Sequence, residues 1–109
     1  MTRLAALREL CLDATRAAGL TPVGDCFHQF EPQGVTGTVL LAESHLAIHT
    51  WPEIGFVSID VYVCNLSVDN SERARQLYEA IRRTLAPAEV REHVQKRGSG
   101  PDRRIRAVA

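Results

Sequence analysis

The chain has 109 residues, of which 45% are hydrophobic and 24% charged, and this composition is typical of one globular domain with its own core. Thirteen basic and thirteen acidic residues give a formal net charge of zero, which argues against nucleic acid or an anionic membrane as the main partner. A domain of this size has no room for separate cofactor and substrate domains, so we expect any large active site to be shared between subunits.

The first predicted element is an amphipathic helix over residues 3–18, because apolar residues recur there at helical spacing. Gly19 follows at the position where helices commonly end on a glycine. Four stretches with the alternation of β-strands come next, and turns rich in Pro and Gly separate the first from the second and the third from the fourth. These predicted strands cover residues 23–30, 37–41, 45–51 and 56–63.

A second helix is predicted over residues 74–85, where Asp69 and Glu72 have the spacing of a capping box and Pro87 closes the pattern. A short last strand is expected over residues 90–94, and residues 98–109 are expected to form a flexible tail. This order of elements predicts a single α+β domain, a two-layer sandwich of a mainly antiparallel sheet with both helices on one face.

Cysteine usage and the lack of apolar runs bear on the compartment. No stretch has the pattern of a signal peptide or the length of a membrane span. The three cysteines, Cys11, Cys26 and Cys64, are odd in number and lack the C-x-x-C spacing of metal sites. We therefore expect reduced thiols in a cytoplasmic protein without a bound metal.

Strand alternation predicts which side chains share the sheet face away from the helices. If the helices cover the apolar rows, the opposite face gathers His49, Trp51, Asp60, Tyr62 and Cys64. Such a mixture is too apolar for a solvated surface and too polar for a core, so it indicates a pocket or a subunit interface. Ser44 is out of phase with His49, and the two can serve one site only if the chain bends around Glu43 and Ser44.

Three runs of residues occur in order between positions 26 and 65: F-H-Q-F-E-P-Q-G-V-T-G, E-S-H-L-A-I-H-T-W-P-E and S-I-D-V-Y-V-C. In this order and spacing they resemble the bacterial and archaeal S-adenosylmethionine decarboxylase proenzymes. The resemblance implies that Ser44 attacks the carbonyl of Glu43, that the chain cuts itself between these two residues, and that Ser44 becomes a pyruvoyl group. Such a group condenses with the substrate amine and draws electrons as carbon dioxide leaves, as pyridoxal phosphate does elsewhere.

The resemblance also implies roles for residues around the cut. Cys64 would donate the proton that completes decarboxylation, because a thiol keeps its proton at neutral pH. His49 would assist self-processing as a base suited to neutral pH. Thr36 stands where a serine is usual and keeps the hydroxyl that supports processing.

Three further residues fall at positions that surround the ligand in the family: Phe30, Trp51 and Glu53. Aromatic rings there could stack on adenine, and a carboxylate could hold the ribose hydroxyls or the sulfonium. Taken alone, the two aromatic residues would equally fit a core or an interface, and Cys64 would equally be a small buried apolar residue.

The resemblance therefore implies a homodimer or higher oligomer that converts S-adenosylmethionine to the aminopropyl donor of spermidine synthesis. The chain departs from the family by beginning almost at the first helix, where members have an additional strand, so the sheet is smaller, the dimer compensates or the ligand site is altered. Asn65 also stands where glycine is usual. Two alternatives stay open: a pyruvoyl-dependent ornithine or arginine decarboxylase, and a non-catalytic paralogue that stays uncleaved and binds a partner.

Overall fold

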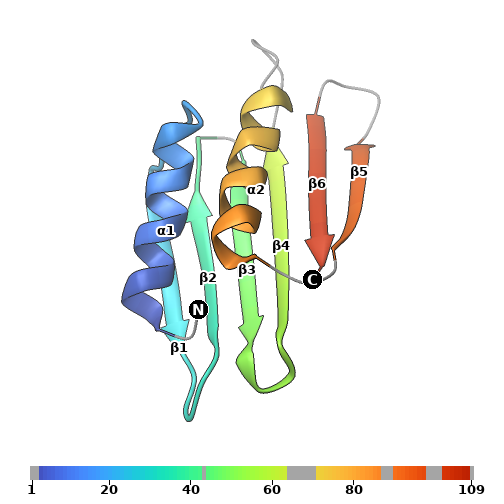
Figure 1. The fold of residues 1–109 in the computed structure, drawn as a ribbon. Helices are drawn as coiled ribbons and strands as arrows, with labels where there is room; N and C mark the ends of the chain where they lie inside the picture. Colours follow the sequence, from blue (N-terminus) through green and yellow to red (C-terminus); the bar gives the residue numbers. More distant parts are fainter. Residues whose placement is uncertain (1–2, 43, 64–70, 87–89, 98–101, 109) are drawn as a thin grey trace.

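The computed structural model describes residues 3–42, 44–63, 71–86, 90–97 and 102–108, in two layers (Figure 1). One layer is a six-stranded sheet and the other is a pair of helices packed on one of its faces. This arrangement confirms the predicted α+β sandwich. The elements are α1 (Leu4–Ala17), β1 (Gly24–Gln29), β2 (Val35–Leu40), β3 (His45–Trp51), the 3-10 turn η1 (Pro52–Ile54), β4 (Phe56–Val63), α2 (Ser71–Leu85), β5 (Arg91–Arg97) and β6 (Asp102–Val108).

The strands lie in the order β1-β2-β3-β4-β6-β5, and every neighbouring pair is antiparallel. The first four strands follow one another as hairpins, whereas β6 lies between β4 and β5 (Figure 1).

The C-terminal segment differs from its prediction. The sequence predicts a flexible tail over residues 98–109, whereas the structure places Asp102–Val108 in β6. The arginines of this segment suggest a solvated charge run, but Arg104, Ile105, Arg106 and Ala107 also alternate in the way of a strand. Pairing with β4 and β5 supplies the backbone hydrogen bonds that the local pattern could not reveal.

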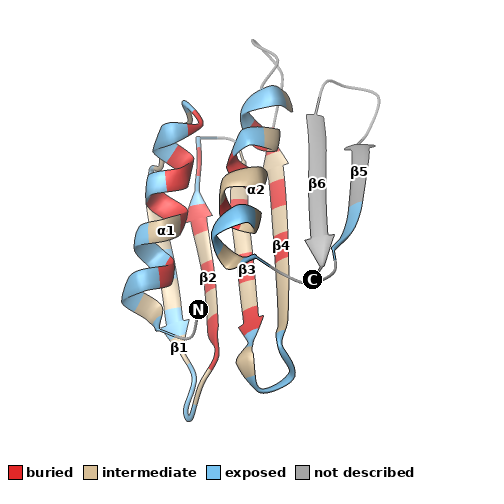
Figure 2. Cartoon of the chain, in the orientation of Figure 1, coloured by how far each residue is buried: buried red, intermediate tan, exposed pale blue. Residues whose placement is uncertain are grey.

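The core lies between the helices and the sheet, where buried residues line the inner helix surfaces and alternate along the strands (Figure 2). In β3, Leu46 and Ile48 are fully buried while the residues between them are not. Full burial of such a side chain is worth roughly 1.5–3 kcal/mol, so these rows fix which face of each strand meets the helices. Cys11 of α1 is also buried in this core, which raises the pKa of its thiol to about 12.

The end of α1 agrees with its sequence signal. Gly19 has a φ of 82°, its N–H donates to the Arg16 carbonyl at 3.0 Å, and the Leu20 N–H donates to the Thr15 carbonyl at 3.1 Å. This is a Schellman motif, which requires the left-handed conformation that glycine adopts without strain. The predicted capping residue Asp69 and the predicted stop at Pro87 lie outside the described residues.

Gly37 lets the sheet approach an aromatic ring closely. A Cβ at this position would overlap the ring of Phe27, its partner in register on β1. The ring packs against the core and covers the backbone of β2 at Gly37. Within the part of the chain that the structure describes, neither helix has the length and apolar character needed to cross a membrane.

Candidate functional site

The face of the sheet opposite the helices carries most of the predicted site residues. His45, Ala47 and His49 are half-buried and alternate with the core residues of β3. The same alternation in β4 places Asp60 and Tyr62 on the face away from the helices. Their neighbours in the strand face the core: Ile59, Val61 and Val63. The predicted grouping of His49, Trp51, Asp60 and Tyr62 on this open face is therefore confirmed. Cys64, the fifth predicted member, lies outside the described residues.

His49 stands in a row of polar residues that crosses four strands. Successive partners in register are His28 on β1, Thr36 on β2, His49 on β3 and Ser58 on β4. The Oγ1 atom of Thr36 lies 3.1 Å from Nδ1 of His49, within hydrogen-bond distance. In the tautomer with its proton on Nδ1, His49 donates this proton to the Thr36 hydroxyl oxygen, so the bond fixes the direction of the ring and leaves Nε2 able to accept a proton.

The ring of His49 lies beside Trp51 at the end of β3, and further aromatic rings lie at this end of the sheet. The His49 and Trp51 ring centroids are 5.9 Å apart, and the Trp51 and Phe56 centroids 5.2 Å apart. Phe30 meets the ring of His28 edge-on at 4.6 Å. Phe30 and Trp51 are 48% and 40% exposed, so both leave area for stacking on another molecule.

Glu53, the third predicted ligand residue, is exposed in the turn η1 that follows Trp51. It follows Trp51 by two residues, and both residues are exposed. The antiparallel register also brings the start of β2 beside the end of β1, so Phe30 lies at the same end of the sheet as Trp51. The structure therefore gathers Phe30, Thr36, His49, Trp51 and Glu53 at one end, which we call the aromatic end.

Ser44 lies at the other end of β3, in the hairpin that joins β2 to β3. The N–H of Leu41 donates to the Ser44 carbonyl at 2.9 Å and closes the hairpin. Ser44 is half-buried, and the chain bends at Ala42. Glu43, on the other side of the predicted cut, lies outside the described residues.

The end of β4 reaches the same end of the sheet as Ser44. His45, which follows Ser44, is the register partner of Tyr62, and their rings meet edge-on with centroids 5.7 Å apart. Val63 is the last described residue before Cys64. We call this the hairpin end, after the turn that contains Ser44.

The two ends are too far apart for Ser44 and His49 of one chain to act on each other. They are five residues apart, which corresponds to roughly 16 Å along an extended strand. The bend at Ala42 precedes Ser44, and β3 then runs as one strand from His45 to Trp51, so it brings the two residues no closer. The bend was expected around Glu43 and Ser44, of which Glu43 lies outside the described residues, and the bend at Ala42 does not unite one site within the chain.

Two features of the site were not among the predicted residues. The Leu41 amide holds the Ser44 carbonyl, and the short spacing between the two predicted strands was its only sequence signal. Ser58 was also missed as the β4 partner of His49, because strand register cannot be read from either strand alone. Within the described residues, no group of three or more His, Cys, Asp or Glu side chains could hold a metal ion.

A family model described as S-adenosylmethionine decarboxylase matches residues 1–98. The chain belongs to the S-adenosylmethionine decarboxylase family. It is 44% identical over 95 residues to the S-adenosylmethionine decarboxylase proenzyme of Persephonella marina, and the match covers 87% of this chain and 68% of that protein. The proenzyme of Symbiobacterium thermophilum is 54% identical over 63 residues, which are 58% of this chain and 48% of that one.

The fold is similar to a solved member of the family. The crystal structure of the adenosylmethionine decarboxylase from Aquifex aeolicus matches with a TM-score of 0.82 and 38% sequence identity. The match covers 90% of this chain and 78% of that one. Sequence and fold thus agree on the S-adenosylmethionine decarboxylase family.

Proposed function

We propose that this chain is the proenzyme of a pyruvoyl-dependent decarboxylase that acts on S-adenosylmethionine. The observation that carries the proposal is the division of its predicted machinery between the two ends of one open sheet face. Ser44 lies in a closed hairpin at one end, and the hydrogen-bonded pair Thr36 and His49 lies among exposed aromatic rings at the other.

The hairpin fits a residue that is converted to a pyruvoyl group by chain cleavage. A cut between Glu43 and Ser44 falls in the turn, so the ladder between β2 and β3 still holds both new chain ends. The carbonyl that accepts the Leu41 N–H belongs to Ser44 and survives the conversion. The group made from Ser44 would therefore keep the hydrogen bond that the Leu41 N–H donates to its carbonyl.

Self-processing needs a nucleophile and a base. The Ser44 hydroxyl oxygen attacks the Glu43 carbonyl carbon, the amide C–N bond breaks, and the freed nitrogen takes a proton, which leaves an ester. A base then removes the Ser44 α-proton, a Cα=Cβ double bond forms, and the bond between Cβ and the ester oxygen breaks to release the Glu43 carboxylate. Uptake of water and loss of ammonia leave the ketone. We assign the role of base to His49, whose ring Thr36 orients.

The distance between Ser44 and His49 leads us to propose that a second copy of the chain supplies the histidine. A twofold axis perpendicular to the strands would set the hairpin end of one open face against the aromatic end of the other. The open face offers suitable contact area, since Phe30, Leu40 and Trp51 are 48%, 48% and 40% exposed. Aromatic and aliphatic side chains among polar ones are typical of subunit interfaces.

Decarboxylation would use the same two ends. When present, the pyruvoyl group supplies a ketone that binds the substrate amine and withdraws electrons as carbon dioxide leaves. Cys64, which follows the end of β4, would give the proton that replaces the carboxylate. Phe30 and Trp51 would stack on the adenine, and Glu53 would attract the sulfonium. The product is the aminopropyl donor for spermidine synthesis.

We propose the cytoplasm as the site of this reaction. Cys11 and Cys26, the cysteines within the described residues, are both free thiols. Free thiols are typical of a reducing compartment, which supports the proposal.

Intact mass spectrometry and a substrate assay test the function together. We expect two fragments divided between Glu43 and Ser44, the larger with a ketone in place of its amino group, and release of carbon dioxide from S-adenosylmethionine. Borohydride should trap this substrate on the larger fragment. Carbon dioxide from ornithine or arginine instead would favour those substrates, and a single intact chain without activity would favour the binding paralogue.

A further inference from the structure

Strand β6 lies outside the segment that matches the family model, although both of its neighbours in the sheet lie inside that segment. It is hydrogen-bonded to β4 on one side and to β5 on the other (Figure 1). The match to the family model ends at residue 98, so β4 and β5 lie inside it and β6 lies outside. A segment beyond the matched region therefore fills a position between two strands that belong to it.

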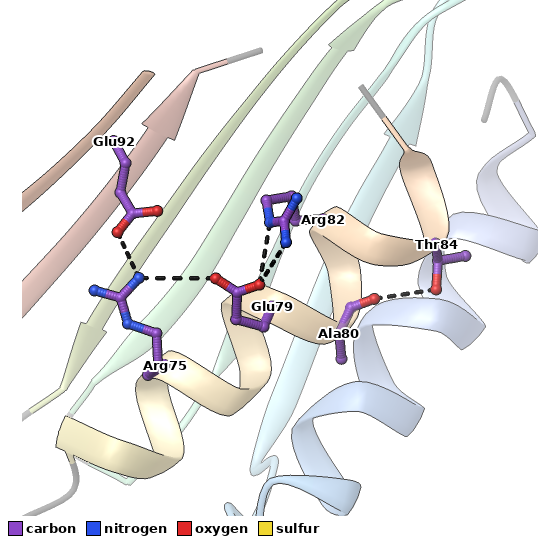
Figure 3. Close-up of polar contacts among 6 residues, drawn as sticks. All are labelled: Arg75, Glu79, Ala80, Arg82, Thr84 and Glu92. Carbon is purple, nitrogen blue, oxygen red and sulfur yellow. Dashed lines mark hydrogen bonds and ion pairs between the residues drawn. The ribbon is translucent and has the colours of Figure 1, made fainter. Parts of the chain in front are cut away.

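Strand β5 also contacts the helix layer, in addition to its pairing with β6. Arg75 of α2 forms an ion pair with Glu92 of β5, and its guanidinium lies 3.8 Å from the Glu79 carboxylate (Figure 3). Glu79 in turn pairs with Arg82 at 2.7 Å. These contacts hold β5 to the helix layer, two strand spacings or roughly 10 Å from β4. Without β6, the outer edge of β4 would face this gap.

The register of β6 reaches the hairpin end of the site. Arg103 is the partner of Val63, and Arg104 is the partner of Tyr62, which also pairs with His45 on β3. The last residues of β4 are thus held between β3 and β6. Cys64 follows them directly in the chain.

We propose that Asp102–Val108 is a positioning strand for the decarboxylation, because it completes the sheet beside β4 and fixes the end of the strand from which Cys64 follows. This inference rests on the proposed function. It also predicts a separation of the two reactions. Ser44, Thr36 and His49 lie on or beside β2 and β3, which do not pair with β6, so β6 should matter for decarboxylation and not for self-cleavage.

A proline in β6 tests the proposal in the full-length chain. Ile105 pairs with Val61 on β4 and with Val94 on β5, and proline at an internal strand position removes a backbone donor from the ladder. We expect Ile105→Pro to be cleaved normally but to lose on the order of tenfold to a hundredfold in kcat, with KM nearly unchanged, since small displacements of a reacting group have effects of that size. Ala109→Pro, beyond the strand, is the matched control.

A chain that ends at residue 98 provides a second measurement. We expect it to be cleaved, to turn over slowly, and to recover when a synthetic peptide of residues 101–109 is added, because a peptide can join an open strand edge. A peptide of scrambled sequence should restore nothing. Normal kcat in either variant would overturn the proposal. Loss of cleavage and of folded structure in both would also overturn it, in favour of a general folding role. An intact wild-type chain without any activity would instead refute the proposed function itself.

Discussion

The two ends of the open face differ in what they hold and in how they are built. The hairpin end holds a main-chain feature, the Ser44 carbonyl fixed by the Leu41 N–H, beside the end of β4. The aromatic end holds side chains, the Thr36 and His49 pair framed by Trp51. In the proposed function, one end is converted while the other orients and binds. This division is the reason why we propose that a second copy of the chain completes the site.

The largest expected effect comes from removing the nucleophile of the hairpin end. Ser44→Ala should abolish both cleavage and decarboxylation, because the hydroxyl starts the first reaction and its carbon skeleton becomes the group that drives the second. Intact mass and carbon dioxide release measure the two losses. An active Ser44→Ala protein would refute the mechanism, and circular dichroism should show that the variant remains folded.

Mixed dimers test whether the two ends of different chains meet. His49→Ala alone should slow cleavage by about 10²–10⁴-fold, the range for loss of a positioned base. When Ser44→Ala and His49→Ala chains carry different tags and are co-expressed, the mixed dimer has one complete site. Only the His49→Ala chain should then be cut at close to the normal rate. If neither chain is cut in the mixed dimer, the two residues serve one site within a chain.

Trp51→Ala should weaken substrate binding at the aromatic end. Stacking of a base on an aromatic ring is worth about 1–3 kcal/mol, so KM for S-adenosylmethionine should rise by about 5- to 150-fold while self-cleavage continues. Steady-state kinetics on the cleaved protein measure the change. Ile54→Ala is the matched control, because Ile54 is 72% exposed in the adjoining turn. An unchanged KM would remove Trp51 from the ligand site.

Thr36→Val should have a smaller effect, confined to processing. The loss of one hydrogen bond costs about 1 kcal/mol, which corresponds to about fivefold slower cleavage. Thr38→Val is the control on the same strand and face, since the Thr38 hydroxyl donates to the Leu46 carbonyl at 3.0 Å and not to His49. Time courses of cleavage should separate the variants. Equal rates for both would show that Thr36 does not orient the histidine.

The smallest expected effect lies away from both ends, in the ion pair of Arg75 and Glu92. The hydrogen bond from Arg75 lowers the pKa of Glu92, so the stabilisation is present above the ordinary glutamate pKa and is lost as the pH falls through the lowered value. Arg75→Gln should reduce the free energy of unfolding by at most about 1 kcal/mol near pH 7, because the pair is partly exposed. Urea titrations should show this difference shrinking as the pH falls below the ordinary glutamate pKa, and Arg83→Gln is the control on the same helix.

The sequence predicts local features of this molecule better than long-range ones. The alternation in β3 and β4 correctly gives the open face, and Gly19 correctly gives the end of α1, because each signal is local. The place of β6 between β4 and β5 depends on pairing between distant segments. The separation of Ser44 from His49 follows from strand geometry, yet a motif that contains both suggests a single site. Proximity in sequence was therefore misleading in the strand that connects them.

The hairpin between β2 and β3 has a consequence for how the protein unfolds. Before cleavage, folding is a first-order event within one chain. After a cut between Glu43 and Ser44, the fragments 1–43 and 44–109 are held together only by noncovalent contacts, and unfolding releases them as separate molecules. The apparent melting temperature of the mature protein should then depend more steeply on its concentration than that of the uncleaved Ser44→Ala protein, because unfolding of the mature protein releases twice as many chains. Self-processing would change the molecularity of folding as well as the chemistry of a residue.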